Sequence, residues 1–180
     1  MGLYVTSNTS QRSLMPRSGR EYWSADRRFG LRISDTEVQK LMGHCKLAGD
    51  TETGGILVGF YTETHDCAIV TDLSGPPPDS QSGKTWFWRG IHGLQGWLRQ
   101  LWTDKRFYLG EWHFHPHSPA VPSKVDRDQL EEIARSVQYN CPEPILLLIG
   151  GTPPRQWEMA AYVFPRMQVY VPLEEGSSDG

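Results

Sequence analysis

Residues 107–126 of this 180-residue chain read FYLGEWHFHPHSPAVPSKVD. His113 and His115 stand two apart in a stretch typical of a strand, so both imidazoles are predicted to project from one face. After seven intervening residues come Ser123 and, three further on, Asp126. That spacing brings their side chains together on the first turn of a helix. The segment therefore predicts a strand, a proline-rich turn and a helix, and the rest of the fold is arranged around them.

The same side chains form a candidate metal site. Two histidines and one carboxylate leave a fourth position open, which is typical of catalytic zinc, because four protein ligands close a structural zinc site. Each half of the pattern also has a simpler explanation. A His-x-His pair is often incidental on a strand, and Ser123 with Asp126 is a helix N-cap with an acidic third residue. The combination in one segment favours the metal site.

A candidate general base lies upstream, in residues 51–59, which read TETGGILVG. Glu52 comes shortly before two glycines and an apolar strand. Because the glycines allow neighbouring backbone to approach closely, we expect Glu52 to lie against other parts of the fold. The alternative is an exposed loop carboxylate.

Together these positions follow a known signature: a glutamate, then His-(Ser/Thr)-His, seven residues, Ser, two residues and Asp. The residues that match it are Glu52, His113, His115, Ser123 and Asp126. The chain therefore resembles the JAB/MPN metalloproteases, whose signature is called JAMM, over about residues 21 to 172. Phe114 departs from the pattern because it replaces the Ser or Thr between the histidines. We expect its side chain to face away from the metal.

The resemblance implies an α/β fold, the JAB/MPN or cytidine deaminase-like sandwich, in which helices flank a mixed curved β-sheet. It also implies one zinc ion per chain, held by His113, His115 and Asp126 with water as the fourth ligand. Glu52 would take a proton from that water and pass it to the leaving amine. Ser123 would donate a hydrogen bond to the oxyanion of the tetrahedral intermediate.

Within the family, residues 108–113 (YLGEWH) resemble most the bacterial branch found beside ubiquitin-like conjugation genes, above all in CBASS antiphage operons. The resemblance implies a deubiquitinase-like zinc isopeptidase that cuts after the C-terminal tail of a conjugated protein. The implied substrate is a CD-NTase, and the implied partner is the E1/E2-like protein that conjugates it. The interval from Asp126 to Pro144 leaves little room for the insertion with which eukaryotic relatives grip a second ubiquitin.

Three alternatives remain open. The enzyme could act on a ubiquitin-like or sulfur-carrier tail of another bacterial pathway, or the chain could be a non-catalytic MPN scaffold. Cupin-type iron oxygenases also use His-x-His on a strand, but no further histidine here is well placed to complete their ligand set. The substrate tail is expected to add along a strand edge, either at residues 56–61 or at the proline-rich loop 74–83.

Composition excludes several other classes. The formal net charge is −3, and no basic excess points to nucleic acid. No apolar run is long enough for a membrane helix, and no signal peptide is evident at the N-terminus. The three cysteines show no C-x-x-C spacing and cannot all pair, so we expect buried thiols in a cytoplasmic protein. We expect a flexible arm (1–20), one domain (21–173) and a polar tail (174–180).

Hydrophobic periodicity predicts further elements. The expected helices span about 35–48, 91–102 and 123–139; the expected strands lie within 22–33 and at 56–61, 67–73, 85–89, 107–115, 144–150, 156–164 and 168–171. Trp86 and Trp88 are expected to pack a core or cover a sheet. Glu111 alternates with the two histidines, so it either orients an imidazole or faces solvent. His117 follows Pro116, which breaks the strand, so His117 need not face the metal.

Overall fold

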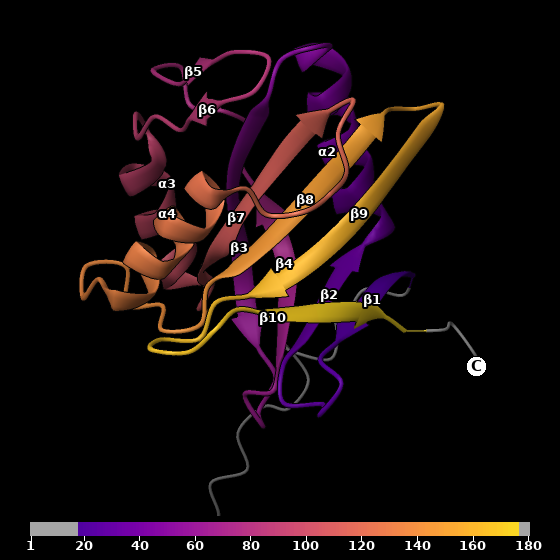
Figure 1. Ribbon diagram of the computed structural model, residues 1–180. Helices are drawn as coiled ribbons and strands as arrows, with labels where there is room; N and C mark the ends of the chain where they lie inside the picture. Colours follow the sequence, from indigo (N-terminus) through magenta and orange to yellow (C-terminus); the bar gives the residue numbers. More distant parts are fainter. Residues whose placement is uncertain (1–17, 177–180) are drawn as a thin grey trace, which may run out of the picture.

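A computed structural model describes residues 18–176 as a mixed α/β domain (Figure 1). The strands of its main sheet are β1 (Gly19–Trp23), β2 (Gly30–Ser34), β3 (Thr53–Tyr61), β4 (Cys67–Leu73), β7 (Phe107–Pro116), β8 (Ile145–Thr152), β9 (Gln156–Val163) and β10 (Val171–Glu175). Two short strands, β5 (Gln81–Ser82) and β6 (Phe87–Trp88), form a separate hairpin. The helices are α2 (Asp35–Ala48), α3 (Leu94–Thr103) and α4 (Lys124–Arg135).

The main sheet closes on itself in the order β1-β10-β9-β8-β7-β3-β4-β2. The β2/β4 and β7/β8 pairs are parallel and the others antiparallel, so the mixed sheet was predicted correctly. The curved-sheet sandwich is not confirmed in that detail, because β1 pairs with both β10 and β2 and closes the sheet into a barrel. We expected one extended segment over Tyr22 to Ile33. Instead a turn divides it, held by a hydrogen bond of 3.0 Å from Phe29 N to Ser24 Oγ.

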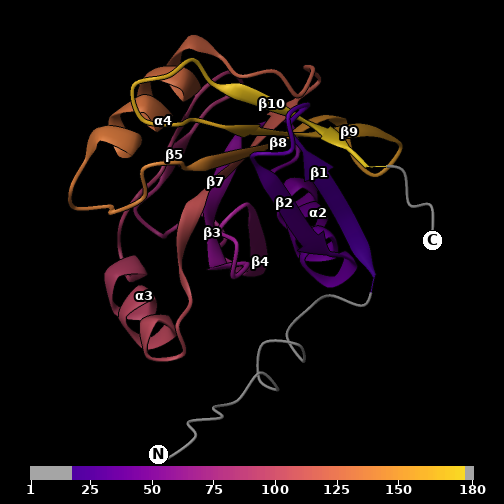
Figure 2. The same ribbon diagram turned by 90° about the horizontal axis from the view of Figure 1, so that it is seen from below.

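The barrel interior holds the largest core. Apolar side chains from all eight strands meet there, among them the fully buried Trp112 and Phe114 of β7. Helix α2 lies beside β1 and β2 on the inner side of the sheet (Figure 2) and adds Val38, Leu41 and Cys45 to this core. It begins where the sequence predicts, because the Ser34 side chain accepts a hydrogen bond from the backbone N–H of Glu37.

Helices α3 and α4 cover the outer side of the sheet (Figure 2). Helix α4 packs Leu130 and Ile133 against Leu146 and Leu148 of β8, whose other side chains point into the barrel. Strand β8 is therefore buried on both faces, which explains its unbroken apolar run. Helix α3 packs Leu101 against β3 in a smaller cluster.

Several aromatic and aliphatic side chains are more exposed than predicted. Helix α3 starts only at Leu94, after Gly93 with its positive φ of 81°, so Ile91 lies before the helix and is 72% exposed. Trp102, at the end of the expected helix 91–102, is 66% exposed. Trp86 and Trp88 are also exposed, at 51% and 73%, because their hairpin stands apart from the barrel. The prediction that Trp86 and Trp88 pack a core or cover a sheet was wrong.

The ends of some elements also differ from expectation. Strand β1 starts two residues inside the predicted arm, and β10 runs two residues into the predicted tail. Residues 1–17 and 177–180, the rest of both segments, lie outside the described residues. Helix α4 ends at Arg135, four residues early, and β5 forms within the loop 74–83. The three cysteines are free and buried, as predicted. No helix in residues 18–176 is long and apolar enough to cross a membrane.

Candidate active site

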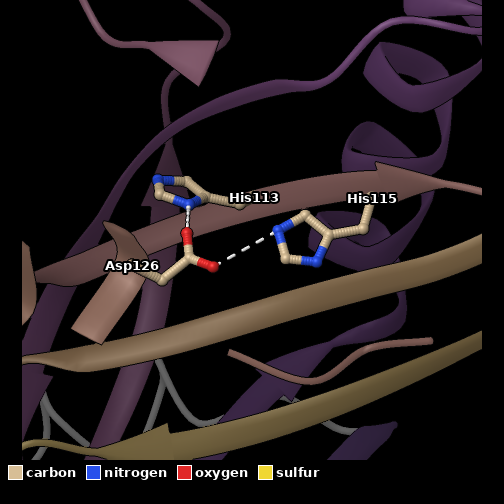
Figure 3. Close-up of side chains that lie close together, drawn as sticks. All are labelled: His113, His115 and Asp126. Atoms are coloured by element: carbon tan, nitrogen blue, oxygen red, sulfur yellow. Dashed lines mark hydrogen bonds and ion pairs between the residues drawn. The ribbon is translucent and has the colours of Figure 1, made fainter. Parts of the chain in front are cut away.

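Strand β7 and helix α4 bring three potential metal ligands together. His113 and His115 project from β7 on either side of the Asp126 carboxylate, which comes from the first turn of α4 (Figure 3). All three side chains are buried, and their ligand atoms lie within 4.8 Å of one another. Phe114, between the histidines, points into the barrel core as expected. The strand alternation therefore separates the metal-binding face from the packing face.

The start of α4 fixes the direction of the Asp126 carboxylate. Its Oδ2 accepts a hydrogen bond of 2.7 Å from the backbone N–H of Ser123, and the Ser123 hydroxyl accepts one of 3.1 Å from the Asp126 N–H. This is the capping box that the sequence predicts. The two carboxylate oxygens then face the histidines: Oδ1 lies 2.7 Å from His113 Nδ1, and Oδ2 lies 3.4 Å from His115 Nε2.

The donor set fits a divalent metal ion. Two imidazole nitrogens and one carboxylate oxygen are common ligands of zinc, and they converge here from a rigid strand and a capped helix end. Three protein ligands leave a position for a water molecule or a substrate. Among residues 18–176, these are the three histidine, cysteine or acidic side chains whose ligand atoms lie close enough together to hold one metal ion.

Glu52 reaches the same face from the neighbouring strand. In the antiparallel β3/β7 pair, Thr53 lies opposite Phe114 and Gly54 opposite His113. Continuing that register places Glu52 beside His115 on the outer face, since directly opposite residues share a face. Gly54 is needed there, because a Cβ atom would come within 2.7 Å of His113 Cδ2. The predicted close approach at the glycines is therefore present at Gly54.

The surroundings of Glu52 adapt it to proton transfer. Glu52 is half-buried, and its backbone N–H donates a hydrogen bond of 2.8 Å to Gly83 O. Burial raises the pKa of its carboxyl group, and the negative charge of Asp126 raises it further, against the opposing effect of His115. A carboxyl pKa moved toward neutrality is what an efficient general base needs.

The ligands influence one another when no metal is bound. Burial disfavours ionisation of Asp126, but hydrogen bonds from His113 and His115 hold its pKa well below the ordinary value. Burial likewise favours a neutral His113, but hydrogen bonds with Asp126 and Glu111 raise its pKa to about 9. At neutral pH a metal ion must therefore displace a proton from His113.

The stability of the metal-free protein should consequently fall as pH rises toward 9. The folded-state pKa of His113, about 9, lies above its ordinary value of 6.5, so the folded protein holds a proton that the unfolded chain has lost. The resulting stabilisation is complete below pH 6.5 and disappears as pH rises through 9. Urea unfolding of chelator-treated protein at pH 6, 7.5 and 9 measures it. In His113→Gln the free energy of unfolding should not fall in this way between pH 6 and 9. An equal fall in that variant would show that His113 is not the group responsible.

Glu111 lies behind the ligands, away from solvent. It is completely buried, and its Oε2 lies 3.4 Å from His113 Nε2, so the solvent-facing alternative was wrong. Arg89 Nε and Gln129 Nε2 donate to the same carboxylate, each at 3.0 Å. Burial alone would raise the pKa of Glu111, but the hydrogen bond with His113 and the charge of Arg89 lower it. The sequence analysis missed Arg89 and Gln129, because residues 22 and 18 positions away share no pattern with Glu111.

His117 and Ser123 lie at the rim of the site. His117 has a φ of 57°, which turns it away from the line of β7, and its Nε2 lies 2.7 Å from Asp50 Oδ1. It is exposed and does not belong to the three-ligand cluster. Ser123 is also exposed, and its hydroxyl accepts from the Asp126 N–H, so its proton is free to be donated toward solvent or a substrate.

Several curated proteins are similar to this chain, among them three bacterial proteins. A CD-NTase/cGAS isopeptidase from Enterobacter hormaechei is 37% identical over 143 residues, which cover 79% of this chain and 79% of that protein. A protein of the same name from Pseudomonas aeruginosa is 26% identical over 163 residues, 88% of this chain and 92% of its own length. A probable metalloprotease from Sinorhizobium fredii is 25% identical over 138 residues, 69% and 80% of the two chains.

One solved structure is similar to this chain in fold. The solution structure of a protein from Desulfitobacterium hafniense matches with a TM-score of 0.56, over 81% of this chain and 88% of that one. At 17% identity, this likeness concerns the fold alone. The family of prokaryotic homologues of the JAB domain matches residues 35–162, which contain Glu52, the three clustered ligands and Ser123. The chain belongs to this family.

Proposed function

We propose that this protein is a zinc-dependent isopeptidase that hydrolyses the amide bond after the C-terminal tail of a conjugated protein. The proposed substrate is a CD-NTase joined to its target in a bacterial CBASS antiphage system. One observation supports the proposal most: a buried His–His–Asp cluster faces Glu52, in a chain 37% identical to a protein named CD-NTase/cGAS isopeptidase. The relative's name supports the proposed substrate class, and the cluster supports the proposed metal chemistry.

In the proposed reaction the three clustered side chains hold the metal ion, while Glu52 transfers protons and Ser123 binds the oxyanion. A zinc ion held by His113, His115 and Asp126 would supply Lewis acidity, which lowers the pKa of a coordinated water to about 7 and polarises the carbonyl group. Glu52 takes a proton from the attacking water. It then delivers that proton to the nitrogen of the leaving lysine or backbone amine. Its raised pKa lets one carboxyl group act as base and then as acid.

Ser123 is the proposed donor to the oxyanion that develops on the carbonyl oxygen. Ser123→Ala should lower kcat about 10²- to 10³-fold with little change in KM, the usual effect of losing one such donor. It also removes the N-cap of α4, which costs about 1 kcal/mol of stability. Ser34→Ala is the matched control, because Ser34 caps α2 away from the site. Steady-state kinetics and thermal melts of both variants separate the loss of catalysis from the loss of stability. If Ser123→Ala and Ser34→Ala had the same kcat, Ser123 would not be the oxyanion donor.

The substrate tail cannot bind where one of our two predictions placed it. Strand β3, which contains residues 56–61, pairs with β4 on one side and β7 on the other, so it offers no free edge. The proline-rich loop 74–83 remains the proposed docking element. It carries β5, which pairs only with β6 in the described part of the chain and leaves its second edge open to β-augmentation. Substitutions in this loop should raise KM.

A fusion of a CD-NTase, through its C-terminal tail, to a reporter protein tests the proposal. Zinc-loaded protein should cut the fusion at the junction, and a chelator should abolish cutting. Mass spectrometry of the products locates the cut bond. An intact fusion would contradict the substrate, and the same assay with fused ubiquitin-like or sulfur-carrier tails then tests the alternative pathway. A protein inactive on every tail would favour a non-catalytic scaffold.

The remaining partners are also part of the proposal. An E1/E2-like conjugating protein would make the bond that this enzyme removes, and both would act in the cytoplasm. The buried thiols Cys45, Cys67 and Cys141 suit a reducing compartment. Co-purification of the protein with its conjugating partner, from cells that contain both, checks this association.

A further inference from the structure

The β5–β6 hairpin pairs with no strand of the barrel, but it lies against the proposed metal site. Its Gly83 carbonyl accepts the backbone N–H of Glu52 at 2.8 Å. The ring of Phe87 meets the ring of His113 edge-on, with 5.8 Å between centroids. A Cβ atom on Gly54 would come within 2.8 Å of Phe87, so this contact depends on that glycine. The hairpin therefore touches both the proposed base and one ligand.

An ion pair beside the hairpin is buried to an unusual degree. Arg89 follows β6 directly, and its side chain is only 6% exposed, while that of Glu111 is 0% exposed. The guanidinium places Nε at 3.0 Å and a terminal nitrogen at 2.8 Å from Glu111 Oε1. Its Nη1 donates to Gly90 O, and the Nη2 that lies near Glu111 also donates to the Tyr139 hydroxyl. Two charges this far from water need such complete pairing to be tolerated.

Glu111 links Arg89 to the proposed metal ligand His113. Its Oε2 faces His113 Nε2 at 3.4 Å, while the other nitrogen of that imidazole, Nδ1, faces Asp126 at 2.7 Å. Gln129 of α4 donates to the same Oε2 at 3.0 Å. A carboxylate that accepts from the far side of a ligating histidine fixes its tautomer and ring orientation, and losing it typically costs about 10- to 100-fold in metal affinity.

We propose that Arg89 and Glu111 are positioning residues that couple the β5–β6 hairpin to the metal ligand His113. The inference rests on the proposed metal site and adds that hairpin docking and metal binding strengthen each other. Coupling of this kind is reciprocal: a docked hairpin raises metal affinity, and bound metal stabilises the docked hairpin by the same factor. The exposed Trp86 and Trp88 of the hairpin would thereby be held beside the site more firmly in the metal-loaded protein.

The variant for the test must remove the ion pair without leaving one charge buried alone. Replacing only Arg89 or only Glu111 would do so and endanger folding. The double variant Arg89→Met with Glu111→Leu replaces both charges by apolar groups of similar size, a change that often leaves stability intact. The matched control is Arg32→Met with Glu21→Leu, which removes the more exposed β1–β2 ion pair of 2.8 Å.

Two measurements on the full-length protein test the coupling, and neither needs a substrate. Competition with a chromogenic chelator should show that the Arg89/Glu111 variant binds zinc about 10- to 100-fold more weakly, with the control unchanged. Hydrogen exchange should show that zinc slows exchange of residues 81–90 in the wild type but not in the variant. Equal zinc affinity of the variant and the wild type would overturn the coupling but not the proposed function. So would hydrogen exchange of residues 81–90 in the wild type that zinc does not change. A wild-type protein that binds no zinc would overturn the proposed function as well.

Discussion

Glu52→Gln should retain bound zinc and lose turnover, with kcat reduced about 10²- to 10⁴-fold, the usual contribution of a positioned acid or base. The amide has nearly the shape of the carboxyl group, so the backbone hydrogen bond to Gly83 and the packing against β7 remain. It cannot take a proton from water at neutral pH. Zinc content measured by elemental analysis, together with cleavage rates on the CD-NTase fusion, checks both halves of the expectation.

The control for this variant is Glu63→Gln, which makes the same change at an exposed residue between β3 and β4. It should leave zinc content and kcat unchanged. The pH dependence of the wild type adds an independent measure, because kcat/KM should fall on the acid side as the Glu52 carboxyl becomes protonated. Burial and Asp126 raise the pKa of that carboxyl in the metal-free protein, whereas a bound zinc ion lowers it, so the acid limb of the profile shows which effect is larger. A fully active Glu52→Gln protein would eliminate Glu52 as the base.

His115→Ala should lose both zinc and activity. It removes one of three ligands, and the two that remain, His113 and Asp126, then have each other as partners at 2.7 Å. Because a protein zinc site needs at least three protein ligands to hold the ion firmly, elemental analysis should find no stoichiometric zinc in the purified variant. Cleavage of the fusion should be absent even with added zinc at concentrations that saturate the wild type.

His92→Ala is the corresponding control, since His92 is exposed just before α3. It should keep one zinc per chain and normal turnover. Stoichiometric zinc in His115→Ala would mean that the ion sits elsewhere. The combination of results matters: zinc retained in Glu52→Gln but lost in His115→Ala separates the residue that moves protons from the residues that hold the metal.

Local patterns explain why much of the candidate site could be predicted. The alternation along β7 placed His113 and His115 on one face and Phe114 on the other, and the capping box placed Asp126 at the start of α4. Each of these inferences uses residues within four positions of one another, where backbone geometry alone determines direction. The glycine at position 54 supplied a further local signal, because only a residue without a side chain fits against His113.

The features that could not be predicted from the sequence all depend on contacts between residues far apart in the chain. Closure of the barrel requires β1 to meet β10, more than 150 residues later, and nothing in either strand encodes that partner. The Arg89–Glu111 pair likewise joins a loop to a strand without periodicity. Trp86 and Trp88 have the alternation of a packed strand, yet they belong to a hairpin that pairs with no strand of the main sheet. Their exposure is a tertiary property.

Anomalous diffraction at the zinc absorption edge, from crystals of the zinc-loaded protein, tests the central claim most directly. We expect one strong peak per chain, about 2.0 to 2.2 Å from a nitrogen of His113, a nitrogen of His115 and a carboxylate oxygen of Asp126, with Glu52 facing the remaining position. Absence of a peak among these three side chains, or zinc held by other residues, would contradict the metal centre on which the proposed isopeptidase depends.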